Sequence, residues 1–168
     1  MYGISILLGG MESGKFSMYN INSEGTGIRV SQQYDSIGSG SDESMKALSG
    51  YVEQLPRDQR DSINREEGLV KVIDATNASS RINVGVGGVP SIAYINDKGV
   101  RSPNEQTCIL ASELVKGLDV GLLDKTFVYR SVADLVYDNG DPNKIGEEMK
   151  SKAVNWDKLD RHLRGYKH

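Results

Sequence analysis

Cysteine, histidine and the largest aromatic residues are scarce in this chain. Its 168 residues include one cysteine, two histidines, one tryptophan and two phenylalanines. A single thiol excludes an internal disulfide and a zinc site built from paired thiolates. Cys108 is expected to be a small buried residue on a helix, because unpaired cysteine behaves as a hydrophobe. We therefore expect neither a metal nor another cofactor.

Long apolar runs and an excess of positive charge are also missing. The longest apolar stretch, residues 4–8, is far shorter than the ~20 residues that cross a bilayer. Twenty lysines and arginines face 23 acidic residues, for a net charge of −3, which provides no basic surface for a phosphate backbone. These absences predict a cytoplasmic protein that binds neither nucleic acid nor a membrane.

The first forty residues have the pattern of strands joined by glycine turns. Stretches rich in β-branched and aromatic residues cover 4–8, 16–21 and 28–30, and glycine-containing turns at 9–14 and 23–27 separate them. This order predicts an antiparallel meander.

Helical periodicity begins after residue 41. Asp42 is the predicted N-cap of a first helix, in which Met45, Leu48, Val52 and Leu55 share one face up to Pro56. Leu69, Val70 and Ile73 mark a second amphipathic helix, and we expect both helices to pack on the sheet.

The remaining pattern is a strand followed by more helix. Residues 91–96 predict a strand that stops at 97–99 and rejoins the sheet. A third helix starts near Glu105, residues 127–137 suit a strand or a helix, and residues 142–166 are predicted to be helical, with Trp156 docked on the body. The fold class is therefore α+β, with a core at 1–104 and a helical extension at 105–168 in the same domain.

The order of these motifs resembles the proteasome β-type and HslV group of the N-terminal-nucleophile hydrolases, over about residues 4–100. Its most specific piece is the run Gly38-Ser39-Gly40-Ser41 directly before a helix, and Gly87-Gly88 before the later strand supports it. The resemblance implies an αββα sandwich, oligomers with proteasome-like subunits, and hydrolysis of peptide or protein substrates.

The resemblance also implies a site. In that family an N-terminal threonine is both nucleophile and base, and the serine of the Gly-Ser-Gly turn helps to hold its amine. Ser39, flanked by Gly38 and Gly40, matches that serine, whereas Asn83 and Val86 fall where the family has aspartate and serine. The family's opening strands, with the threonine, have no counterpart before Met1, so we expect a catalytically incomplete threonine-peptidase relative.

Two alternatives remain open at this stage. A non-catalytic assembly subunit would account for the altered positions at 83 and 86. A phosphate-binding loop is the third hypothesis, since Gly9, Gly14 and Lys15 have the spacing of that motif, although Phe16 stands at the place of its magnesium-binding hydroxyl.

Overall fold

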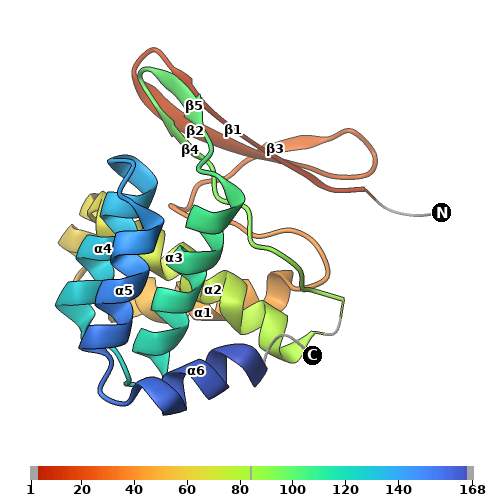
Figure 1. Cartoon of the computed structure of the whole chain (residues 1–168). Helices are drawn as coiled ribbons and strands as arrows, with labels where there is room; N and C mark the ends of the chain where they lie inside the picture. The colour runs from red at the N-terminus through yellow and green to blue at the C-terminus, as the bar shows by residue number, and fades with distance from the viewer. Residues whose placement is uncertain (1–3, 84, 166–168) are drawn as a thin grey trace.

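The computed structural model describes residues 4–83 and 85–165, and these form six α-helices beside two small antiparallel sheets (Figure 1). The strands are β1 (Ile6–Glu12), β2 (Lys15–Ile21), β3 (Gly27–Arg29), β4 (Tyr94–Asn96) and β5 (Gly99–Arg101). The helices are α1 (Ser41–Gln54), α2 (Arg65–Ile82), α3 (Glu105–Asp119), α4 (Lys125–Tyr137), α5 (Pro142–Lys152) and α6 (Trp156–Gly165), with a short 3-10 helix at Arg57–Ser62. The mixed α+β class is as predicted.

The meander of the first thirty residues is present, but its first turn is tighter than predicted. β1 runs on to Glu12, which pairs with Lys15, so that Ser13 and Gly14 alone make the turn, with φ of 50° and 77°. Gly9 therefore lies within the strand. The Phe16 ring covers it, with Cζ 3.1 Å from where a Cβ would stand on Gly9, and an aromatic neighbour of this kind compensates for a glycine in a strand.

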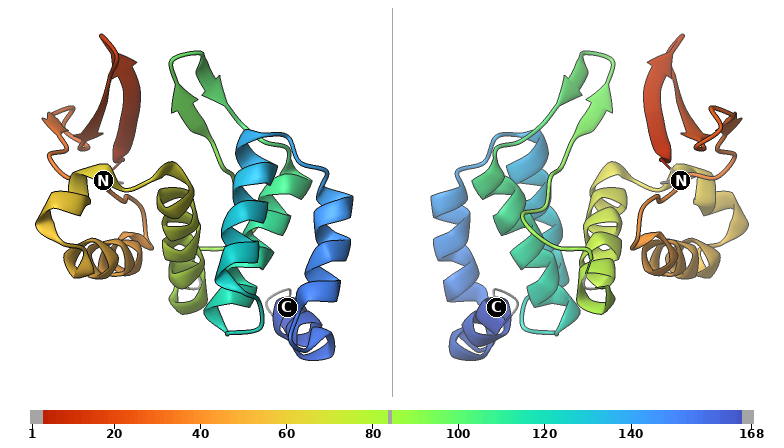
Figure 2. Two further views of the ribbon diagram at one scale, coloured as in Figure 1. Left: turned by 90° about the vertical axis from the view of Figure 1, so that its left-hand side faces the viewer. Right: turned by 90° about the vertical axis from the view of Figure 1, so that its right-hand side faces the viewer.

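The strand after residue 90 does not rejoin the first sheet. Within residues 4–83 and 85–165, β4 pairs with β5 alone, through a turn at residues 97–98 that agrees with prediction. The resulting hairpin faces the first sheet (Figure 2), and the Ile95 side chain comes within 3.9 Å of the position that a Cβ on Gly9 would occupy. The hairpin thus covers one face of the first sheet without extending it.

The hydrophobic core lies among the helices. α2 packs on α1, α3 and α4, and α5 and α6 close the other side of α3. The innermost side chains are fully buried and come from α2, α3, α4 and α6: Val70, Leu114, Val115, Val128, Val132 and Leu159. No helix of the described residues is long and apolar enough to cross a bilayer.

The predicted packing of the first two helices on the sheet is wrong. Leu48, Val52, Val70 and Ile73 are buried as predicted, but α2 presents its apolar residues to α1, α3 and α4, and the β1–β3 sheet projects beyond the helices (Figure 1). From residue 105 onward, α3 to α6 supply most of the core cluster.

The ambiguous stretch at 127–137 is helical. Phe127, Val128, Val132, Leu135 and Val136 recur at helical spacing and are buried, and the Asp124 carboxylate caps the helix by accepting a hydrogen bond from the Phe127 N–H at 3.1 Å. The predicted helical tail divides into α5 and α6. Leu159 and Leu163 of α6 belong to the core cluster, and Trp156 packs against it. The docking of this helix on the body of the protein is as predicted.

Candidate functional site

The Gly38–Ser41 turn leads directly into α1. Gly38 has φ of +96°, which favours glycine, and its carbonyl accepts a hydrogen bond from the Ser41 N–H at 3.1 Å. Gly40, not the predicted Asp42, is the N-cap of α1, and no side chain caps the helix. Asp42 lies in the first turn of the helix, where its negative charge interacts favourably with the positive end of the helix dipole.

Gly40 is buried against the C-terminal end of α2. A Cβ at this position would stand 2.8 Å from Val86 Cγ2 and 2.9 Å from Ser79 Cβ. The Ser79 hydroxyl donates to the Gly40 carbonyl at 2.8 Å, and Ser44 Oγ lies 2.6 Å from Ser79 Oγ. The ends of α1 and α2 are therefore held by a hydroxyl pair, and only glycine fits between them.

Asn83 fastens the turn to the segment that follows α2. It is the C-cap of α2, and its Nδ2 donates to the Ser39 carbonyl at 2.5 Å while its Oδ1 accepts from the Gly85 N–H at 2.9 Å. Both ends of the side-chain amide are therefore used. An aspartate could not donate the first of these bonds.

The structure thus brings the predicted site residues together. Ser39 contacts Asn83 and Gly40 contacts Val86, where the start of α1 meets the end of α2, and Gly38 begins the same turn. Ser39 is exposed, and its Oγ forms no hydrogen bond with any described residue. A serine hydroxyl needs an adjacent base to act as a nucleophile, and the contacts of this cluster are with hydroxyls, amides and apolar groups. The described residues of the cluster can position a polar group, and none of them is a base that could activate one.

The phosphate-loop interpretation is wrong. Residues 9–15 form the end of β1, a two-residue turn and the first residue of β2, whereas a phosphate-binding loop must open a helix whose N–H groups face the anion. Lys15 instead stands opposite Glu12 on the neighbouring strand.

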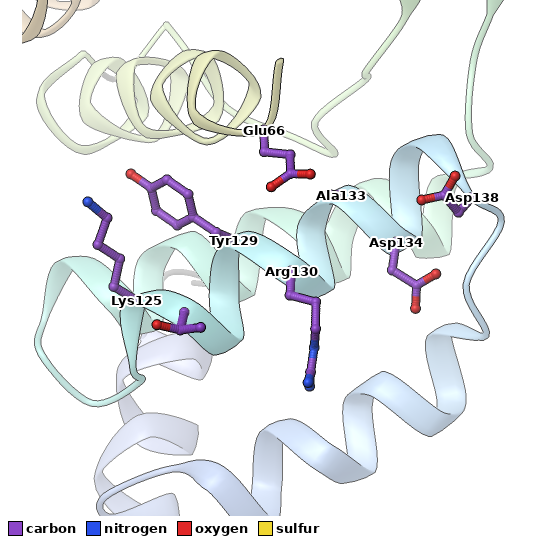
Figure 3. A pocket seen from close by; sticks show the side chains of 8 residues that line it. Glu66, Lys125, Tyr129, Arg130, Ala133, Asp134 and Asp138 are labelled. Carbon is purple, nitrogen blue, oxygen red and sulfur yellow. The ribbon is translucent and has the colours of Figure 1, made fainter. Parts of the chain in front are cut away.

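A separate depression lies between the start of α2 and α4. Its volume is about 600 Å³, and its lining includes Glu66, Lys125, Tyr129, Arg130 and Asp134 (Figure 3). Lys125 Nζ lies 5.0 Å from the centre of the Tyr129 ring. Burial raises the pKa of Tyr129 above its usual value, so the phenol stays neutral. Charges of both signs line this open depression, which therefore shows no preference for an anion or a cation.

Sequence reasoning missed Ser44 and Ser79. A signal was present, because Ser44 precedes Leu48 and Val52 at intervals of four and so shares their buried face, and Ser79 follows the buried Ala75 at the same interval. A second buried polar pair also joins two helices: the Ser112 hydroxyl of α3 donates to Asn77 Oδ1 of α2 at 2.8 Å.

Comparison with known proteins adds no assignment: no protein-family model matches the chain, and neither curated proteins nor solved structures give a significant match.

Proposed function

We propose that this chain is a relative of the proteasome β-type peptidases that supplies the supporting part of a peptide-hydrolysis site and not its nucleophile. The observation that carries the proposal is the contact between the Ser39 turn and Asn83, two places that the family resemblance assigns to one site. Ser39 would hold an incoming α-amine through its exposed hydroxyl.

The chain's own threonines do not supply the nucleophile. All four are internal, so their nitrogens are amides and cannot act as bases: Thr26, Thr76, Thr107 and Thr126. Val86 stands where the family resemblance implies a serine, and one of its methyl groups packs against Gly40. The isolated chain should therefore neither hydrolyse fluorogenic peptides nor react with threonine-directed boronates.

The test of the supporting role is the binding of a free amine. A short peptide that begins with threonine is titrated into the isotope-labelled chain, and amide chemical shifts of Gly38–Ser41 and Gly85 are followed. The free-amine peptide should move these signals, whereas the N-acetylated peptide and the Ser39→Ala variant should show no such change. Absence of any shift with the free amine at millimolar concentration would contradict the proposal, and so would peptide hydrolysis that disappears in Ser39→Ala.

The second candidate is a non-catalytic assembly subunit. One observation favours it: both the nitrogen and the oxygen of the Asn83 amide bind backbone groups, as those of a structural residue would. For an assembly subunit, the free-amine peptide should shift no amide signals of Gly38–Ser41 in either the parent chain or Ser39→Ala. The same titration therefore separates the two candidates.

A further inference from the structure

The first sheet leaves one long strand edge open. In the order β1-β2-β3, β1 is an outer strand of seven residues, and the described residues place no strand beside it. Met18 lies opposite Gly9, and its carbonyl accepts a hydrogen bond from the Val30 N–H at 2.8 Å, on the β3 side. The backbone groups of Met18 therefore point toward β3, and those of Gly9, directly opposite, point away from β2. Because these directions alternate along a strand, the backbone N–H and C=O groups of Leu7 and Met11 also point away from β2.

The open edge lacks the features that protect outer strands. Natural edges carry lysine, proline or a bulge, or are very short. β1 contains no lysine, arginine or proline and pairs with β2 without a break in register. Its single charge, Glu12, stands opposite Lys15. On the face away from the β4–β5 hairpin, Ile6 and Leu8 are 52% and 55% exposed.

We propose that β1 pairs antiparallel with β1 of a second copy of this chain, with the two-fold axis at Gly9. The strand runs from Ile6 to Glu12, so Gly9 is its midpoint and the whole strand matches its own copy in this register. The residues whose backbone groups point away from β2 then form hydrogen-bonded pairs: Gly9 with Gly9 of the second copy, and Leu7 with Met11 of the second copy. Two three-stranded sheets become one sheet of six strands.

The side chains favour a second copy over an unrelated strand. On one face, Leu7 and Met11 form an apolar cross-strand pair on each side of the axis, and glycine leaves the axis itself free of side chains. On the other face, Leu8 lies opposite Gly10 of the second copy, so that a large residue meets a small one twice. The charge of Glu12 is balanced by Lys15 within each copy, so the two edges do not repel one another.

The oligomeric state of the full chain tests the pairing. Sedimentation velocity should show a monomer–dimer equilibrium at about 100 µM, a weak association of the size expected for a small interface. Leu8→Lys places two cations on diagonal neighbours across the axis and should weaken the dimer at least tenfold. Ile28→Lys makes the same change at a residue that is 66% exposed on the opposite outer strand and should leave the equilibrium unchanged. Circular dichroism confirms that both variants are folded.

Crosslinking tests the register. In a hydrogen-bonded pair the two Cα atoms are about 5.5 Å apart, which suits a disulfide. The double variant Leu7→Cys/Met11→Cys should form a covalent dimer on mild oxidation, while either single variant should not, and Cys108 is too deeply buried to interfere. A strict monomer at the stated concentration, an equal effect of Ile28→Lys, or crosslinking of the single variants as efficient as that of the double variant would overturn the proposal.

Discussion

Replacing Gly40 by alanine should destabilise the protein mainly through steric conflict. Gly40 has φ of −100° and ψ of 7°, a region of negative φ that is allowed to alanine, so backbone preference contributes less than the steric conflict. The added Cβ would stand 2.8 Å from Val86 Cγ2 and 2.9 Å from Ser79 Cβ, closer than carbon atoms approach without displacing each other. Extra atoms in a packed site cost about 1–3 kcal/mol.

Thermal and urea unfolding measure this cost. For a chain of this size, each kcal/mol lowers the melting temperature by about 2–4 °C. Gly50→Ala is the matched control, since it lies in the same helix with open space around its Cβ position. That variant should gain about 0.5–1 kcal/mol from higher helix propensity. Opposite signs for the two substitutions are the expected result.

A double-mutant cycle identifies the conflict. Val86→Ala removes one of the two close carbons, so it should recover part of the loss caused by Gly40→Ala, with a coupling of about 0.5–3 kcal/mol. Ser79 Cβ remains in place and keeps the rescue incomplete. A Gly40→Ala protein as stable as the parent, or purely additive effects, would refute the close contact between α1 and the segment after α2.

Three further outcomes follow from the same structure. Asn83→Asp should destabilise the protein, because the new carboxylate would face the Ser39 carbonyl without a proton to donate; chemical denaturation with Asn83→Ala as comparison measures it, and an Asp variant more stable than the Ala variant would contradict it. Burial, followed by the neighbouring Glu67 carboxylate, raises the pKa of Tyr51 to about 12, so stability that is intact below pH 10 should fall as pH rises from 10 to 12 and should fall less in Tyr51→Phe. The difference between the near-ultraviolet titrations of the parent and Tyr51→Phe isolates this phenol among the eight tyrosines, and a midpoint near 10 would count against its burial. Leu114→Ala should cost about 2–5 kcal/mol, whereas Val72→Ala, at a side chain 53% exposed, should be nearly neutral, and comparable losses would mean that the core is assigned wrongly.

Local periodicity was enough to predict the first three helices, α1 to α3. Leu48 and Val52 lie four residues apart and are buried together, and the pattern from Glu105 onward predicted α3. Valine at 128, 132 and 136 left α4 ambiguous, because β-branched residues suit a strand as well as a buried helix. Only packing against α2 and α3 on both sides decides between them.

Tertiary contacts caused the errors in the sheet region. Gly9 and Gly10 have the composition of a turn, but a phenylalanine seven positions away covers Gly9 and keeps it within a strand. The hairpin at 94–101 was expected to extend the sheet and instead packs on its face, with Ile95 against Gly9, and no local signal marks this contact.

The candidate site was located by resemblance, since no periodicity connects residue 39 with residue 83. The resemblance placed Asn83 beside the turn but treated it as a degenerate acid. The structure gives its amide a role that an acid could not fill, because it donates to one backbone group and accepts from another. A substitution that departs from a pattern can therefore maintain a local structure by different chemistry.

The two proposals can fail independently because they rest on different parts of the molecule. Ser39 and Asn83 lie where α1 and α2 meet, whereas the open edge belongs to a sheet that contacts the helices little and projects beyond them. Leu8→Lys should therefore dissociate the dimer without changing amide shifts at Gly38–Ser41, and Ser39→Ala should abolish amine binding without changing the sedimentation profile. Loss of both properties in either variant would mean that the sheet edge and the turn are coupled, and that the second copy completes the site.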